Sequence, residues 1–270
     1  MGKETTKALS QPNASAGLQS LTTGLVIVEF FARREEPIGV TAIAKALGLP
    51  KAKIHRYLTT LRDLGYLTQD PGDERYRAGW GLYVLGHDIR HNFSMVRLAR
   101  PAIEAACRRI EMTIVMSVST GSEFVVIDFA APPSPLEMGL RPGSRFPLNS
   151  GAQGKIALAF GESSVFDEFV ARPLEKMTQS TVVDPAALAE EIESVRERGW
   201  ADAPDQLFLG VNAVAVPVFG PAKSLVGAIA AVGMTSALAS PPPPDVVGVL
   251  KSAADDISQR LGSGGVTHNK

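Results

Sequence analysis

Three features that would each indicate a particular class of protein are scarce in this sequence. Its 270 residues include a single cysteine, so no internal disulfide can form. Cys107 falls among apolar helical positions, where we expect a buried structural thiol rather than a reactive one. No apolar run approaches the roughly 18 residues that span a bilayer, and the first residues lack the apolar core of a signal peptide. We therefore expect a cytoplasmic protein with no membrane partner.

Histidine, the third scarce feature, limits the chemistry available. There are 4 histidines, and none lies between His91 and His268. His87 and His91 stand four residues apart, a spacing that can chelate a metal, but no third ligand is apparent. We therefore expect no metal.

Recognisable catalytic motifs are also missing. No nucleophile elbow occurs, and the segment 149–156 fails the phosphate-loop pattern because Asn149 replaces the first glycine and Ile156 follows the lysine. Ser150 and Asp128 are the nearest catalytic candidates. The sequence predicts no enzyme and no cofactor.

Charge is divided unevenly along the chain, although the net charge is only −1. Residues 1–100 carry 14 Lys and Arg against 9 Asp and Glu, whereas the remainder carries 13 against 19. The segment from Thr41 to Arg62 contains five basic residues and no acidic one. A basic module joined to an acidic one indicates that only the first faces a polyanion.

The basic segment has the pattern of a winged helix-turn-helix. Apolar spacing predicts a first helix over 20–34, with Leu21 and Leu25 on its apolar face, and a short strand at Val40. Thr41 is the expected N-cap of a second helix that ends at Gly48. A third helix over 50–64 follows a tight turn, with its predicted buried stripe at Ile54, Tyr57, Leu58, Leu61 and Leu64. Residues 66–77 then form a β-hairpin turned at 70–73, which is the wing.

Two short helices joined by a turn are the arrangement that places the second helix in the DNA major groove. Arg56 is the residue we expect to read a base edge, with a phosphate contact left open as the alternative. Lys51, Lys53 and Arg75 are expected to position the protein on phosphates. The predicted DNA-binding residues are Thr41, Lys51, Ala52, Lys53, His55, Arg56, Thr59, Arg62, Arg75 and Arg77. The competing interpretation is an ordinary helical pair with a solvated basic face.

The remaining chain divides into a connecting helix and a second domain. We expect disordered tails at 1–17 and 263–270, a DNA-binding domain at 18–79, a linker helix at 80–100 and an effector domain at 101–262. Pro101 is expected to break the linker helix and start the next one. Apolar residues beyond one face of the linker make it a candidate dimer surface.

The second domain has an α+β pattern. Strands are expected at 113–119, 123–130, near 136–141, at 211–219 and at 225–232. Helices are expected at 101–112, 152–160, 163–170, 185–198 and 245–261. Strands in hairpins, with helices grouped between them, indicate an antiparallel sheet with packed helices.

Several runs of this sequence resemble the IclR family of bacterial transcriptional regulators. They are GLPKAKIHRYLTTLRDLGYLTQDPGDERYRAGWGLYVLG from Gly48, LARPAIEAA at 98–106, FPLNSGAQGKIALA at 146–159 and LGVNAVAVPVFGPAKSLVGAIAAVG at 209–233. The resemblance implies a GAF-like effector fold and dimers, often paired into tetramers. The family's Ser and Thr before its His-Arg pair are Ala52 and Lys53 here, and its histidine before the small-residue run is Asn149.

The resemblance also implies an effector site between the segment 148–152 and the last two strands. A helix beginning in this segment offers free N–H groups that favour a carboxylate, although N-capping by Ser150 and a turn at Asn149 are equally open interpretations. The predicted effector-binding residues are Met138, Leu140, Leu148, Asn149, Ser150, Gly151, Ala152, Asp205, Val214, Ala230 and Val232.

Where the family often has serine and cysteine in the last two strands, this chain has apolar residues at 213–215 and 229–232. Apolar walls accept an apolar ligand body without leaving a buried polar group unpaired. We therefore expect a regulator of double-stranded operator DNA, modulated by a small organic acid that is aromatic or otherwise bulky rather than a short keto acid. The alternative is a ligand-binding or catalytic domain whose winged helix serves only protein contacts.

Overall fold

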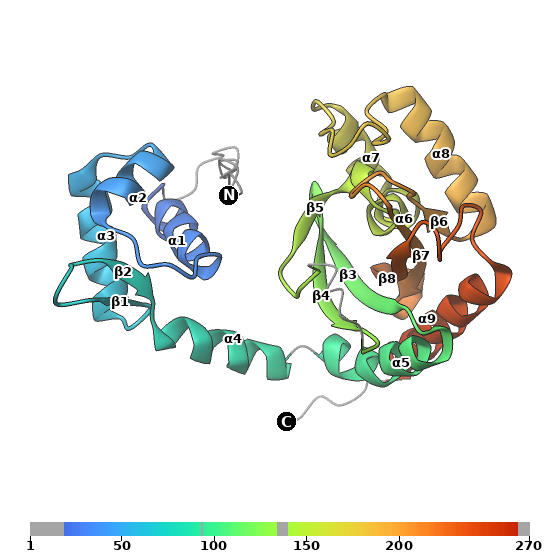
Figure 1. Ribbon diagram of the computed structural model, residues 1–270, viewed down its shortest axis with the longest axis horizontal. Helices are drawn as coiled ribbons and strands as arrows, with labels where there is room; N and C mark the ends of the chain where they lie inside the picture. Colours follow the sequence, from blue (N-terminus) through green and yellow to red (C-terminus); the bar gives the residue numbers. More distant parts are fainter. Residues whose placement is uncertain (1–18, 93, 134–139, 264–270) are drawn as a thin grey trace. The chain divides into compact units, whose positions relative to one another are not determined.

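The computed structural model describes residues 19–92, 94–133 and 140–263, which form two compact units divided between Asn92 and Phe93. The tail expected at 1–17 lies outside the described residues, as does the tail expected at 263–270 apart from Ser263, which is helical. No helix in the described ranges is long and apolar enough to cross a membrane. Each unit is described below by itself (Figure 1).

The first unit is a winged helix-turn-helix with one hydrophobic core. Its elements are α1 (Gln19–Ala32), α2 (Val40–Leu47), α3 (Lys51–Asp63), β1 (Leu67–Gln69), β2 (Tyr76–Ala78) and α4 (Trp80–Asn92). The antiparallel pair β1 and β2 makes the wing. Ile27, Phe31, Ile43, Ile54 and Leu58 are buried in the core that joins the first three helices.

The turn between α2 and α3 depends on a glycine in the left-handed region. Gly48 has φ 64°, a conformation that costs other residues free energy, and its position ends α2 as the sequence predicts. The start of α2 differs from the prediction. Gly39 is the N-cap, Val40 is the first helical residue, and Thr41 caps nothing. The extended backbone lies earlier, at Ile38, which pairs with Tyr76.

Burial in α1 and at the end of α3 also differs from the predicted stripes. Leu21 and Leu25 are 61% and 55% exposed, because Ile27 and Phe31 occupy the side of α1 that faces the core. Leu25 lies two residues before Ile27, a rotation of roughly 200° about the helix axis. Leu64 is 63% exposed because it follows the last residue of α3 instead of continuing its buried face. Hydrophobic spacing therefore located both helices and the buried positions Ile54, Leu58 and Leu61 of α3, whereas its assignment of Leu21, Leu25 and Leu64 was wrong.

The stretch 80–100, expected to be one linker helix, is divided between α4 and the next helix, and the prediction of a break at Pro101 is wrong. Pro101 lies inside α5 (Ser94–Ile110). The missing N–H costs one helical hydrogen bond at that position. Ala99, Ala102 and Ile103 are buried around it, and this packing against the second unit's core offsets the loss.

The second unit is an antiparallel sheet covered by helices on both faces, with strand order β5-β4-β3-β8-β7-β6. Its strands are β3 (Thr113–Thr120), β4 (Glu123–Ala130), β5 (Arg145–Pro147), β6 (Ala201–Asp202), β7 (Val211–Phe219) and β8 (Leu225–Met234). Its other helices are η1 (Leu148–Ser150), α6 (Ala152–Phe160), α7 (Ser163–Val170), α8 (Pro185–Arg198), η2 (Pro221–Lys223) and α9 (Pro244–Ser263). This is the α+β, GAF-like arrangement that the sequence predicts.

Alternation along the central strands divides this unit into two cores. Val214, Val216 and Ile229 point toward α5 and α9, whereas Ala215 and Ala230 point toward α6 and α8. Figure 1 shows α5 and α9 side by side, with α6 and α8 on the opposite side of the sheet. Cys107 is buried in the α5 and α9 core, where burial raises the pKa of its thiol.

Two short strands were missed, and a third prediction falls mostly outside the described residues. The strands β5 and β6 have three and two residues, too few to show a period. Residues 136–139 of the strand expected near 136–141 lie outside the described residues, and Leu140 and Arg141 are not in a strand.

Candidate DNA-binding surface and effector cavity

The outer face of α3 is available for DNA. Because Ile54, Leu58 and Leu61 face the core, Ala52, Arg56 and Thr59 lie on the outer side at helical spacing. The side chains that flank this outer face are Lys51, Lys53 and His55. Lys53 and Thr59 are half-buried, and the other four of these six residues are exposed. Thr41, at the start of α2, is also exposed.

The wing presents Arg75 and Arg77 on one face, as the prediction of alternation requires. Both are exposed, and the buried Tyr76 between them anchors β2 to the core. Asp73 organises the turn by accepting a hydrogen bond from the Arg75 backbone N–H at 3.0 Å. The Arg75 guanidinium lies 3.6 Å from the same carboxylate.

Arg62 has a different position from the other basic residues of α3. Its guanidinium pairs with Asp63 at 2.8 Å and donates to Gln69 Oε1 of β1 at 3.2 Å. Arg62 thereby joins the recognition helix to the wing and neutralises an acidic side chain at its end. The sequence analysis missed this arrangement, because a contact between a helix and a hairpin has no spacing signal.

The second unit contains a large apolar cavity between the sheet, the start of α6 and the loop that follows β6. Its volume is about 870 Å³, within the usual range for small-molecule sites. The residues that line it are Glu111, Met112, Thr113, Phe124, Pro132, Leu140, Gly151, Gln153, Ala203, Leu207, Phe208, Val211, Ala213, Val232, Gly233, Met234 and Ala237. Glu111 is the charged member of this set, and none of these described residues is Lys, Arg or His.

Aromatic rings form one part of the cavity wall. Phe124 and Phe208 line the cavity, and Phe146 packs between them with ring centroids 5.5 and 5.8 Å away. The contact with Phe208 is edge to face, an arrangement that aromatic pairs favour. A planar apolar ligand would find complementary surface here.

The start of α6 borders this cavity, and two glycines allow close packing there. A Cβ on Gly154 would lie 2.1 Å from the Leu148 carbonyl oxygen, so glycine lets η1 fold tightly against the first turn of α6. A Cβ on Gly151 would lie 2.9 Å from Cζ of Phe124, so glycine is also required for the aromatic wall. Gly151 is the N-cap of α6 and contributes no side-chain hydrogen bond. The helix therefore presents N–H groups and the positive end of its dipole at the cavity.

The predicted effector residues separate into several groups. Leu140, Gly151 and Val232 line the cavity, and Met138 lies outside the described residues. Leu148, Ala152 and Ala230 are buried in the adjoining core around α6. Val214 points away from the cavity, because side chains alternate along β7 and the cavity takes Val211 and Ala213. The inclusion of Val214 was therefore wrong.

Three polar residues of the prediction make structural contacts. Asn149 Nδ2 donates to the carbonyls of Glu175 and Val182, at 3.0 and 2.8 Å, and so fixes that loop. Ser150 Oγ donates to the Pro147 carbonyl at 2.8 Å rather than capping α6. The Asp205 carboxylate accepts from the Gly210 N–H at 2.5 Å, which closes the loop carrying Phe208.

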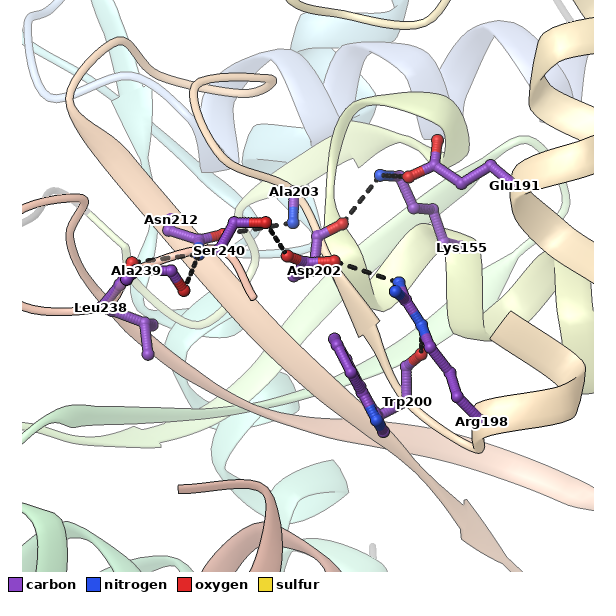
Figure 2. A network of polar contacts seen from close by, with 10 residues as sticks. All are labelled: Lys155, Glu191, Arg198, Trp200, Asp202, Ala203, Asn212, Leu238, Ala239 and Ser240. Carbon is purple, nitrogen blue, oxygen red and sulfur yellow. Dashed lines mark hydrogen bonds and ion pairs between the residues drawn. The ribbon is translucent and has the colours of Figure 1, made fainter. Parts of the chain in front are cut away.

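A polar network fixes the cavity wall at the start of β7 (Figure 2). Asn212 accepts from the Ala203 N–H at 3.2 Å and donates to the carbonyls of Leu238 and Ala239. Asp202 accepts from Ser240 and pairs with Arg198 at 3.0 Å. The network adjoins the cavity directly, because its member Ala203 lines it. Sequence neighbours of other members, at positions 211, 213 and 237, also line the cavity.

Lys155 extends the network to α6. Its ammonium group is fully buried, pairs with Glu191 of α8 at 2.5 Å and donates to the Asp202 carbonyl at 2.8 Å. Burial lowers the pKa of Lys155, and the Glu191 carboxylate opposes that effect.

Lys155→Met should destabilise the second unit by about 2–4 kcal/mol, the usual range when one partner of a buried pair is removed, reduced because Glu191 is partly exposed. Urea unfolding followed by circular dichroism measures this loss. Lys176→Met provides the matched control, since Lys176 is exposed and contacts only Gln179 among the hydrogen bonds of the described residues. Equal stability of the two variants would contradict a stabilising role for the buried pair.

The described residues contain no group of three or more His, Cys, Asp and Glu side chains that could hold a metal ion. The fold and the two sites define a class of protein: a winged helix-turn-helix DNA-binding regulator with a ligand-binding domain. Family models support this assignment. The IclR helix-turn-helix domain matches residues 20–71, and the bacterial transcriptional regulator IclR C-terminal domain matches residues 87–259. The chain belongs to the IclR family of transcriptional regulators.

Individual relatives agree with this family. The DNA-binding transcriptional repressor YiaJ of Escherichia coli K12 is 27% identical over 97% of this chain and 94% of its own. A solved IclR-type regulator from Alicyclobacillus acidocaldarius is 24% identical, with a TM-score of 0.81 over 91% of this chain and all of its own. An IclR homologue from Microbacterium hydrocarbonoxydans, solved with 4-hydroxybenzoate, is 22% identical, with a TM-score of 0.76 over 90% of this chain and 98% of its own.

Proposed function

We propose that this regulator binds operator DNA through α3 and the wing, and that an aromatic carboxylic acid in the cavity of the second unit modulates that binding. The observation that carries the proposal is the apolar cavity of about 870 Å³ that is bordered by the start of α6. The cavity belongs to the ligand-binding domain of a DNA-binding regulator. Its ligand is therefore the effector, and its site of action is the cytoplasm, where bacterial DNA lies.

On the DNA side, Arg56 is the proposed base reader, because it is exposed on the outer face of α3 and no salt bridge among the described residues occupies it. Lys51, Lys53, Arg75 and Arg77 are proposed to contact phosphates. Arg62 is proposed to act mainly by holding α3 against the wing, since its guanidinium is already paired.

A homodimer, or a dimer of dimers, would present two recognition helices to the two halves of a pseudo-palindromic operator. Support comes from the apolar side chains exposed on α4. Trp80, Tyr83 and Val84 are 79%, 65% and 52% exposed, which is unusual for large side chains in a protein that stays monomeric. Burial of this face between two copies would remove it from water.

Two features support an aromatic acid over a short keto acid. The cavity is larger than a two- or three-carbon acid needs, and Phe124 and Phe208 offer aromatic surface to the ligand body. The first turn of α6 offers N–H groups to a carboxylate. The Microbacterium hydrocarbonoxydans homologue was solved with an acid of this class, 4-hydroxybenzoate, which supports the same ligand chemistry here.

Calorimetric titration of the purified protein with 4-hydroxybenzoate, benzoate, pyruvate and glyoxylate tests the effector class. The proposal expects the two aromatic acids to bind more tightly than the two short acids, and to change the affinity for operator DNA. Tight binding of pyruvate or glyoxylate with no binding of the aromatic acids would reject it.

A further inference from the structure

Gln153 is a polar side chain of the cavity lining that lacks a hydrogen-bond partner among the described residues. Gln153, the second residue of α6, is only 5% exposed, and its carboxamide makes no hydrogen bond with the described residues. Its Oε1 lies 3.7 Å from the position that a Cβ on Gly151 would take, so the amide folds over the start of α6. A carboxamide that lines an apolar cavity without a partner offers a hydrogen bond that a ligand with a matching polar group can take up.

Gln153 also lies between the main cavity and a smaller second cavity. It lines the main cavity and a second cavity of about 80 Å³, which is large enough for a water molecule. The Ser117 hydroxyl lines the smaller cavity, and it is buried without a partner. No hydrogen bond joins Ser117 to the carboxamide among the described residues, so both the donor and the acceptor of Gln153 remain available to a ligand.

The charge of the cavity makes this donor important. Glu111 is the charged residue in the described lining, and it would repel an acid rather than attract it. With no cationic side chain among these residues, a carboxylate would depend on neutral donors, namely the backbone N–H groups of the first turn of α6 and the side chains of Gln153 and Thr113. Gln153 and the backbone donors lie at the same end of the cavity.

We propose that Gln153 determines which polar head group the effector carries: its Nε2 donates to the effector's carboxylate beside the N–H groups at the start of α6. The proposal rests on the proposed function, which places an aromatic acid in this cavity. A carboxamide selects the carboxylate through its donor, whereas a carboxylate at position 153 would only accept hydrogen bonds. Gln153→Glu should therefore reverse the preference from an acid to the corresponding neutral amide.

The test compares 4-hydroxybenzoate with 4-hydroxybenzamide by calorimetry on the full-length protein. Wild type should prefer the acid. Gln153→Glu should bind the acid about 10 to 100 times more weakly, the effect of losing a hydrogen bond to a charged group, and should bind the amide at least as well as wild type does. Gln153→Leu should weaken the acid by about tenfold and not gain affinity for the amide. Gln259→Glu adds the same charge at an exposed position of α9 and should change neither affinity.

A pH series separates charge repulsion from damage to the fold. Acidification that protonates the introduced carboxyl of Gln153→Glu should restore acid binding to that variant, whereas a misfolded variant would not recover. If wild type binds 4-hydroxybenzoate and both Gln153 variants bind it equally well, the role of Gln153 is rejected while the proposed function stands. If wild type binds neither 4-hydroxybenzoate nor benzoate, the proposed function is rejected and the role of Gln153 with it.

Discussion

Arg56→Ala should reduce affinity for operator DNA by about tenfold or more at each recognition helix, since a bidentate contact to a guanine is worth about 1–3 kcal/mol. Folding should not change, because Arg56 is exposed and faces away from Ile54, Leu58 and Leu61 in the core. Fluorescence anisotropy with labelled operator and with single-base variants measures both affinity and sequence preference.

The two contact types give different results in this experiment. Loss of a base contact weakens operator binding and also relaxes the preference at one base pair, whereas loss of a phosphate contact weakens all sequences alike. Arg33→Ala serves as the control because it removes the same charge from an exposed residue that directly follows α1 and pairs with Glu29. Uniform weakening across all duplexes would contradict base reading by Arg56, and unfolding of the variant would contradict its assignment to the outer face.

Gly151→Leu should abolish the ligand response, with at least a 100-fold loss of effector affinity, while operator affinity stays within about threefold. A Cβ at this position would lie 2.9 Å from the Phe124 ring, so the ring must move and the new side chain must occupy the cavity. The backbone itself imposes no strain, since Gly151 has φ −146°. Calorimetry with 4-hydroxybenzoate and anisotropy with operator measure the two effects.

Gly248→Leu provides the matched control. Gly248 is exposed on α9, and a Cβ there would meet nothing within 4 Å. Both its ligand response and its DNA affinity should resemble those of wild type. A Gly151→Leu protein that still binds and responds to the effector would contradict the assignment of this cavity, and one that loses DNA binding would contradict the division of labour between the two units.

Elements with a strong local signal could be predicted from the sequence. The bounds of α6, α7 and α8 and those of β4 and β7 agree with the prediction, because helical spacing, turn residues and β-branched runs mark them. Tertiary packing decided the cases that failed. Pro101 is accommodated within α5 by the burial of its neighbours, and Leu21 and Leu25 are exposed because the core lies on another side of α1.

The cavity was only partly predictable for a related reason. The start of α6 at Gly151 was predicted correctly, whereas Val214 on β7 was predicted in error. A shift of one residue moves a strand side chain to the opposite face of the sheet. Gln153 was missed because a polar residue in the first turn of a helix resembles a surface position. In the fold it lines the cavity together with Phe124 and Ala203, which are distant in sequence.

The most direct test of the account is binding of the purified protein to a labelled duplex of its own upstream intergenic DNA, compared with a scrambled duplex across a salt series. The account predicts a preference for the upstream DNA, with the logarithm of the affinity falling by about 0.9 per contacted phosphate for each unit of log salt. Equal, weak and salt-insensitive binding to both duplexes would contradict it, and would favour a winged helix that serves only protein contacts.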